Sequence, residues 1–235
     1  MKATLTSLII IGLLFAGCKK ESPKAKTYQL NSITYTDGGV NTNVLFVYDD
    51  QGRLSGYNDT RSGGRYKYTY GADGNVSSAD VIDNYTSQIM QTNKVTYSAN
   101  TINISGPNFN FTFNDKKQLI KADSYDNNYV TFTYNDAGDI IKTIQYDADG
   151  AVVYTNTFTY DNNPNPLHAL AAKNVHFGAF SDAVAAFSVH NIITRSNTII
   201  TNNYKYLDNG LPYSIVAVSS DGAASTYATY NYTTK

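Results

Sequence analysis

Several residue types are missing or scarce in this 235-residue chain, and each shortage excludes a class of protein. The chain has no tryptophan and one cysteine, Cys18, so no disulfide can form within it. Its single glutamate, Glu21, lies near the amino terminus, which excludes His-Glu-x-x-His zinc proteases, glutamate-based glycosidases and EF-hands from the remainder. With 18 basic and 19 acidic residues the net charge is −1, so the chain offers no basic field and we expect no nucleic-acid partner.

Tyrosine is abundant. The chain contains 21 tyrosines and 10 phenylalanines, while charged residues make up 16% of it against a usual share of about 25%. This composition, with many threonines and asparagines, is typical of a soluble, turn-rich β protein. A chain of this size buries roughly 70% of the surface that it exposes when unfolded, so it needs neither a disulfide nor a metal to hold a core.

The amino terminus has the features of an export signal and an anchor. Lys2 precedes an apolar run at residues 8–17 that is too short to cross a bilayer, so residues 1–17 are predicted to be a removed signal peptide. The run ends in Ala-Gly-Cys18, which resembles the bacterial lipobox, where small residues precede a cysteine that carries diacylglycerol. We therefore expect lipid on Cys18 to hold the protein on a membrane, with residues 18–27 as a flexible tether. The alternative is an ordinary signal followed by an unmodified cysteine.

The rest of the chain repeats one phrase: an aromatic residue, any residue, Tyr or Phe, four turn residues that usually end in Gly, one more residue and an aliphatic residue. Residues 46–54 and 68–76 are the clearest copies. Asp or Asn opening the turn and Gly closing it are typical of a type I turn with a G1 bulge. Gly52, Gly74 and Gly138 are therefore predicted to have positive φ.

Each copy predicts a β-hairpin, because the bulge places the aromatic residue before the turn opposite the aliphatic residue six positions later. The predicted fold is all-β: a curved antiparallel meander of about a dozen strands, each five to eight residues long, forming an open or partly closed barrel-like sheet. A β-sandwich is the alternative. Residues 28–235 are expected to form one domain. Its second sheet face is rich in Thr, Asn, Ser and Lys, which argues against a lipid-facing surface.

Two family resemblances rest on these motifs. Residues 48–54, YDDQGRL, resemble the YD repeat of Rhs-type bacterial surface and toxin-shell proteins. Over most of its length the chain resembles Bacteroidetes lipoproteins that carry a YD-like domain of unknown function with a porin-like fold. The lipobox, the Tyr/Asp/Gly hairpins and the Asn-Pro-Asn-Pro segment at residues 163–166 carry this resemblance. It implies an extracytoplasmic all-β domain and no particular activity.

Residues 161–197 interrupt the hairpin spacing. Residues 167–173 and 177–187 are rich in alanine and predict one or two short helices, with Ser181 as a candidate cap of the second. An apolar stripe at helical spacing predicts that this insertion packs on the sheet, with a pocket along its border lined partly by strand tyrosines. The stripe consists of Phe177, Phe180, Val184 and Phe187. The alternative role is a lid or a partner-binding element.

All three histidines, His168, His176 and His190, lie in or beside this insertion. Their spacings match no helical i, i+4 pair and no zinc pattern, and the sequence has no Gly-x-Ser-x-Gly, P-loop or dinucleotide motif. We therefore assign no catalytic residue, no metal ligand and no cofactor. The three histidines together with Tyr66 and Tyr68 form the candidate ligand surface.

Arginines near strand tyrosines could add polar groups to a binding surface. Arg53, Arg61 and Arg65 are the candidates, near Tyr57 and Tyr66.

These features favour a noncatalytic, lipid-anchored module of the bacterial cell envelope that binds or scaffolds a glycan, a peptide or an envelope protein. The outer membrane is the expected location, with the periplasmic and external faces both open. One alternative is a hydrolase of envelope or other polymers that uses a histidine and an aspartate near the insertion. A third is an assembly partner with an exposed apolar patch.

Overall fold

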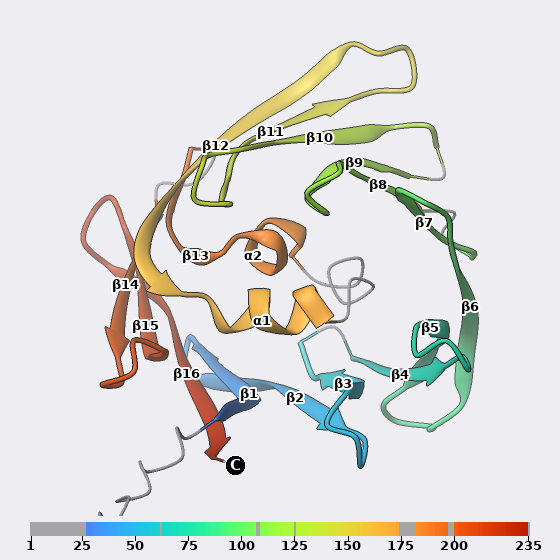
Figure 1. Ribbon diagram of the computed structural model, residues 1–235. Helices are drawn as coiled ribbons and strands as arrows, with labels where there is room; N and C mark the ends of the chain where they lie inside the picture. The colour runs from blue at the N-terminus through green and yellow to red at the C-terminus, as the bar shows by residue number, and fades with distance from the viewer. Residues whose placement is uncertain are drawn as a thin grey trace, which may run out of the picture.

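The computed structural model describes residues 27–61, 63–106, 109–124, 126–173, 182–196 and 200–234. These residues form sixteen strands around two short helices (Figure 1). The strands are β1 (Tyr28–Asp37), β2 (Val40–Tyr48), β3 (Leu54–Asp59), β4 (Gly64–Tyr70), β5 (Val76–Asp83), β6 (Ile89–Tyr97), β7 (Thr101–Ile104), β8 (Phe109–Phe113), β9 (Leu119–Asp123), β10 (Tyr129–Tyr134), β11 (Ile140–Tyr146), β12 (Val152–Pro164), β13 (His190–Arg195), β14 (Ile200–Tyr206), β15 (Pro212–Ser219) and β16 (Ala224–Thr234). Helices α1 (Pro166–Lys173) and α2 (Ala183–Phe187) lie between β12 and β13.

The sheet is a closed antiparallel barrel in which every strand pairs with its neighbours along the chain and β16 returns to pair with β1. The seam runs from Tyr28 opposite Thr234 to Thr36 opposite Tyr227. The all-β, barrel-like meander is confirmed; the sheet is fully closed rather than open or partly closed, it has more strands than the predicted dozen, and the sandwich alternative is wrong. Twist accumulated over so many strands brings the two edges together, and their pairing satisfies the backbone groups that both edges would expose.

The repeated phrase forms hairpins with the predicted register. In each copy the aromatic residue before the turn pairs with the aliphatic residue six positions later, directly after a one-residue register shift. These pairs are Tyr48 with Leu54, Tyr70 with Val76, Phe113 with Leu119, Tyr134 with Ile140, and Tyr146 with Val152. The shift is the bulge that the turn sequence predicts, so the local structure follows from the phrase itself.

The backbone at the end of each turn confirms the glycine prediction. Gly52, Gly74 and Gly138 have φ values of 76°, 80° and 92°. Lys117 stands at the same place in another copy and adopts a φ of 61° despite its side chain. The turn geometry therefore persists where the sequence departs from the phrase, at a local cost of about 1 kcal/mol.

Tyrosine hydroxyls join successive hairpins to one another. A tyrosine at the end of one hairpin strand donates a hydrogen bond to a carbonyl at the start of an earlier strand. The bonds are Tyr48 Oη to Leu30 O (2.6 Å), Tyr70 Oη to Leu54 O (2.7 Å), Tyr160 Oη to Ile140 O (2.6 Å) and Tyr232 Oη to Pro212 O (2.8 Å). We call this series the tyrosine ladder. It explains the tyrosine excess, since each ring packs on the core while its hydroxyl satisfies a main-chain carbonyl.

Strand direction alternates, so turns that follow even-numbered strands lie at one end of the barrel. We call this the terminal end, because β1 starts and β16 finishes there, and the opposite end the far end. The terminal end carries most copies of the phrase, with turns at residues 49–53, 71–75, 114–118, 135–139 and 207–211. The chain enters α1 at the same end after β12.

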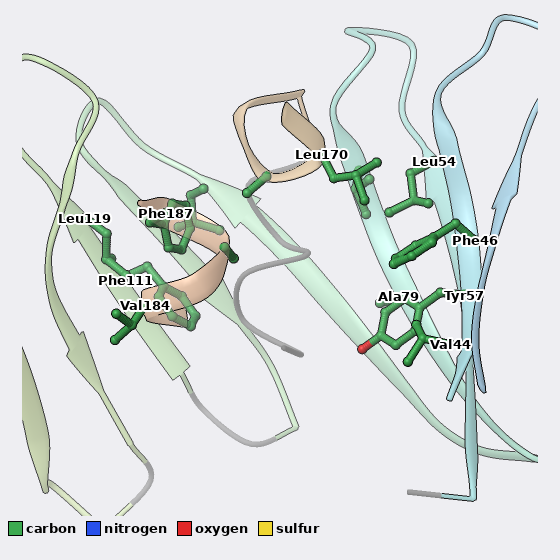
Figure 2. Packing of buried hydrophobic residues seen from close by; sticks show 14 of the residues in the cluster. Val44, Phe46, Leu54, Tyr57, Ala79, Phe111, Leu119, Leu170, Val184 and Phe187 are labelled. Carbon is green, nitrogen blue, oxygen red and sulfur yellow. The ribbon is translucent and has the colours of Figure 1, made fainter. Parts of the chain in front are cut away.

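The two helices occupy the interior of the barrel (Figure 1). Val184 and Phe187 of α2 face Phe111 and Leu119 of the barrel wall, as Figure 2 shows. On α1, Leu170 points toward the wall near Leu54. The expected packing of the insertion is therefore confirmed for Val184 and Phe187. Neither helix of the described part of the chain has the length and continuous apolar surface that a bilayer crossing requires.

The cap of α2 is Asp182, whose Oδ1 accepts hydrogen bonds from the Val184 and Ala185 amides at 3.1 and 3.2 Å. The expectation that Ser181 caps this helix is therefore corrected, because the helix starts later than its alanine content suggests. Asp fills the cap position as well as Ser does. Ser181, Phe177 and Phe180 lie outside the described residues.

Candidate functional site

A cavity of about 350 Å³ lies between the helices and the inner faces of β1–β3 and β13–β16. It borders the insertion and is lined partly by strand tyrosines, as the sequence predicts. Its apolar wall includes Ile33, Val44, Phe46, Ile192 and Ile215. Its tyrosines are Tyr35, Tyr57, Tyr204 and Tyr230, and its amide side chains are Asn165, Asn191 and Asn202.

A first ion pair stands at the end of β3. The Arg61 side chain donates from Nε to Asp59 Oδ1 at 2.9 Å and from Nη2 to Asp59 Oδ2 at 2.7 Å. Its guanidinium lies 4.2 Å from the centre of the Tyr35 ring, in a cation–π arrangement. Burial raises the pKa of the Tyr35 hydroxyl, so this group stays protonated at neutral pH. The three side chains form a rigid polar corner of the cavity.

A second ion pair joins the insertion to β13. Arg195 Nη2 donates to Asp182 Oδ2, while Oδ1 of the same carboxylate caps α2. The Arg195 guanidinium lies 5.5 Å from the centre of the Phe158 ring. One carboxylate thus fixes both the start of the helix and the arginine on the barrel wall. With Arg61 and Asp59, the four charged side chains at the cavity sum to zero.

The cavity opens toward the far end of the barrel. Its charged groups sit there and reach solvent, since the Arg61, Asp182 and Arg195 side chains are 45%, 44% and 31% exposed. Asn165 and Leu167, at the start of α1, line it from the insertion side. Arg61 follows β3 and Arg195 ends β13, so the solvent-exposed mouth of the cavity lies at the end of the barrel away from the chain termini.

Hydrogen bonds fix the amide side chains of the cavity wall. Asn202 Nδ2 donates to Ile192 O at 2.9 Å, and Asn191 Nδ2 donates to Asn163 O at 3.1 Å. The Tyr204 hydroxyl also donates to Ile192 O, at 3.2 Å. These contacts leave little rotational freedom, so the polar wall is arranged before any ligand arrives.

The candidate ligand residues from the sequence lie elsewhere. Tyr68 is buried in the core. Tyr66 stacks on Tyr57, a residue of the cavity wall, with ring centres 4.6 Å apart. Neither is among the described residues that line the cavity. Cys18 and His176 lie outside the described residues.

The structure brings two of the histidines together with an aspartate behind α2. Asp139 Oδ1 accepts a hydrogen bond from the His190 amide at 2.8 Å, and Asp139 Oδ2 lies 2.9 Å from His190 Nδ1. His168, on α1, is close enough for both groups to act on its charge, and burial lowers its pKa. The Asp139 side chain is only 3% exposed, and none of the three is among the described residues that line the cavity.

Ser188 completes this buried network. Its Oγ donates to the Tyr160 hydroxyl at 2.9 Å and accepts from the Ile140 amide at 3.2 Å. These hydrogen bonds connect the insertion to the turn before β11, so the role that they support is structural. Within the described residues, no group of three or more His, Cys, Asp or Glu side chains is arranged to hold a metal ion.

Sequence reasoning found part of this site. It named Arg61 and Tyr57 as candidates, and both line the cavity. It missed Asp182 and Arg195, because their contact is made only when the insertion folds back on β13. It also missed Tyr204, because nothing in the neighbouring sequence distinguishes this residue from the other strand tyrosines.

No family model and no curated protein sequence matches the chain. Among solved structures, the chain is similar to a porin-like protein from Bacteroides uniformis, with 16% identity over 89% of this chain and 99% of that chain and a TM-score of 0.47. A porin-like protein from Bacteroides vulgatus shows 11% identity over 88% and 99% of the two chains, with a TM-score of 0.43. The TcdB2-TccC3-TEV structure shows 13% identity over 79% of this chain and 13% of that chain, with a TM-score of 0.33.

Proposed function

We propose that the chain is a lipid-anchored lipoprotein of the bacterial cell envelope whose barrel is a noncatalytic module that binds a small ligand. The observation that carries this proposal is the cavity, with a prearranged polar wall, an apolar wall and a mouth at the far end. A cavity of about 350 Å³ is in the range of small-molecule sites, and most such sites combine apolar walls with a few fixed polar groups.

The lipid anchor gives the cavity an orientation. Residues 18–26 span at most about 30 Å when fully extended, so lipid on Cys18 would keep the barrel close to the membrane. The described chain begins at Thr27, at the terminal end. The mouth of the cavity, at the opposite end, would then face the aqueous phase, where a soluble ligand can enter.

The chemistry of the cavity favours binding over catalysis. Its two carboxylates, Asp59 and Asp182, are each paired with an arginine, so neither carboxylate is available to attack a substrate. The hydrolase alternative would need substrate access to the His190 and Asp139 pair, and the burial of Asp139 weighs against it. Noncatalytic binding is therefore the function that the site supports best.

A ligand search with a blocked variant tests this proposal. Ala185 of α2 lines the cavity, so Ala185→Phe should fill it, while Ala151→Phe places the same ring in an exposed turn as the control. The full-length lipoprotein in detergent is incubated with a small-molecule extract of bacterial cells, and bound compounds are identified by mass spectrometry. We expect compounds enriched on the wild type and on Ala151→Phe and lost on Ala185→Phe. Identical enrichment on all three proteins, or none, would contradict a binding cavity.

A further inference from the structure

We propose that the ligand is a neutral carbohydrate, with one sugar ring held in the cavity between the Arg61–Asp59 pair and the strand tyrosines. This inference rests on the proposed function, because it names the class of ligand for the same cavity. It follows from the charge, the two kinds of wall and the size of the cavity.

The charges of the cavity argue for a neutral ligand. Arg61 is bound by Asp59 through two hydrogen bonds, and Arg195 is bound by Asp182. A charged ligand would have to displace one partner from its counter-ion and leave the other without compensation in a partly buried site. A neutral ligand can enter while both pairs stay intact, because it carries no charge that competes for either partner.

The walls call for a ligand with two different surfaces. Ile33, Val44 and Ile215 contribute aliphatic surface, and the tyrosines contribute ring faces. Asn191 and Asn202 contribute fixed amides. A sugar ring has this combination, because its C–H face packs on an aromatic ring while its hydroxyls both donate and accept hydrogen bonds at the rim. An alkyl chain would bury the amides and hydroxyls without replacing their bonds to water, which disfavours it.

The tyrosines supply hydroxyl groups that remain protonated. Burial raises the pKa of Tyr204 and of Tyr230 well above the ordinary value, as it does for Tyr35. A protonated phenol oxygen can accept a hydrogen bond from a sugar hydroxyl, and it can do so in Tyr204 even though that hydroxyl already donates its proton to Ile192 O.

The size of the cavity limits what is enclosed. Its 350 Å³ equals the liquid volume of roughly a dozen water molecules. This accommodates one sugar ring, or two in part, and excludes a folded peptide or a long polymer. A larger glycan could place its terminal sugar in the cavity and leave through the mouth between Arg61 and Arg195.

The chain contains a matched control for the arginine at the mouth. Arg53 pairs with Asp49 at 2.7 Å and lies 3.9 Å from the centre of the Tyr70 ring, which repeats the arrangement of Arg61, Asp59 and Tyr35. Arg53 stands in a turn at the terminal end, away from the cavity. Arg61→Gln and Arg53→Gln therefore make the same chemical change to the same kind of trio at opposite ends of the barrel.

The test measures binding to the full-length lipoprotein in detergent by isothermal titration calorimetry. The neutral probes are D-glucose, D-galactose, N-acetyl-D-glucosamine and their β-linked disaccharides. The comparison probes are D-glucuronate, trialanine and decanoate. We expect at least one neutral sugar to bind the wild type and Arg53→Gln with equal affinity and to bind Arg61→Gln at least about tenfold more weakly. The wild type should also bind D-glucose, the neutral counterpart of D-glucuronate, in preference to D-glucuronate itself.

Circular dichroism checks that both arginine variants fold, and Tyr35→Phe, which keeps the ring, serves as a second cavity variant. Binding of trialanine or decanoate without any sugar would overturn the carbohydrate assignment and leave the binding module standing. Sugar binding unchanged in Arg61→Gln and Tyr35→Phe would place it outside this cavity and overturn the proposal. No binding of any probe at millimolar concentration, with no compound lost on Ala185→Phe, would overturn both the ligand class and the proposed function.

Discussion

The two ends of the barrel are built from the same kind of hairpin, yet they differ in how regular they are. At the terminal end the turns repeat one phrase, and the tyrosine ladder links them hairpin to hairpin. At the far end the connections vary, and two arginines and two aspartates gather around the mouth of a cavity. The comparison teaches that repetition in this chain encodes the scaffold, whereas the candidate site lies where the repetition stops.

Loss of the proposed lipid anchor should produce the largest effect, because the anchor would hold the terminal end of the barrel at the membrane. Cys18→Ser is expected to move the protein from the membrane fraction to the soluble envelope fraction, since a thiol to carry lipid is no longer present. Cell fractionation followed by immunoblotting measures this shift. A mutant that stays with the membranes to the same extent as the wild type would show that the anchor assignment is wrong.

Truncation of the core at the terminal end should be the next largest change. Leu54 follows the first phrase turn and is fully buried, so Leu54→Ala should lower the free energy of unfolding by about 2–5 kcal/mol. Leu45→Ala, on the exposed side of β2, is the control and should change it by less than about 0.5 kcal/mol. Equal losses in urea unfolding would contradict the assignment of the core to the interior of the barrel.

Two substitutions at the last turn position, Gly74→Val and Lys117→Gly, should change stability in opposite directions. Gly74 has a φ of 80° with open space around it, so Gly74→Val should cost about 1–2 kcal/mol through backbone strain alone. Lys117→Gly should relieve the same strain and stabilise the protein, by less than about 1 kcal/mol because glycine also gains freedom in the unfolded chain. Thermal unfolding of both variants measures these effects. The bulge interpretation fails if both changes shift the midpoint in the same direction.

Each hydrogen bond of the tyrosine ladder should contribute about 1 kcal/mol to the free energy of unfolding. Tyr48→Phe removes the hydroxyl that donates to Leu30 O and keeps the packed ring, so it should destabilise by roughly that amount. Tyr154→Phe, at an exposed position on β12, is the control and should be neutral. Comparable unfolding midpoints for the two variants would remove the ladder as a source of stability.

Acidification should weaken the attachment of the insertion to the barrel. Burial lowers the pKa of His168 below its value of about 6.5 in the unfolded chain, so the unfolded state binds the proton more readily. The contribution of neutral His168 to the free energy of unfolding is fully present above the unfolded-state pKa of about 6.5. It is lost as the pH falls from there through the lower pKa of the folded state. The difference in unfolding free energy between pH 7.5 and 5.5 should therefore shrink in His168→Gln. A pH dependence identical to that of the wild type would exclude His168 as its source.

Local sequence was sufficient to predict the hairpins. The register at Tyr48 and Leu54, the positive φ of Gly52 and the helical character of the insertion all arise within a few residues of the chain. The features that could not be predicted join distant segments. His190 meets Asp139 across 51 residues, and β1 meets β16 across nearly the whole domain. No local pattern specifies such contacts, because they depend on how far the sheet has curled when its ends meet.

The pairing of β1 with β16 also sets the order in which the protein can be completed. The hairpins need only neighbouring residues, so they can form one after another as the chain is made, but the ring closes only when β16 (Ala224–Thr234) pairs with β1. Until then β1 and β15 present unpaired strand edges, which are templates for pairing with another chain. A product that ends before Ala224 would keep both edges permanently and be prone to aggregation and proteolysis. Closure of the barrel therefore depends on β16, a strand that contributes Tyr230 alone to the cavity wall among the described residues.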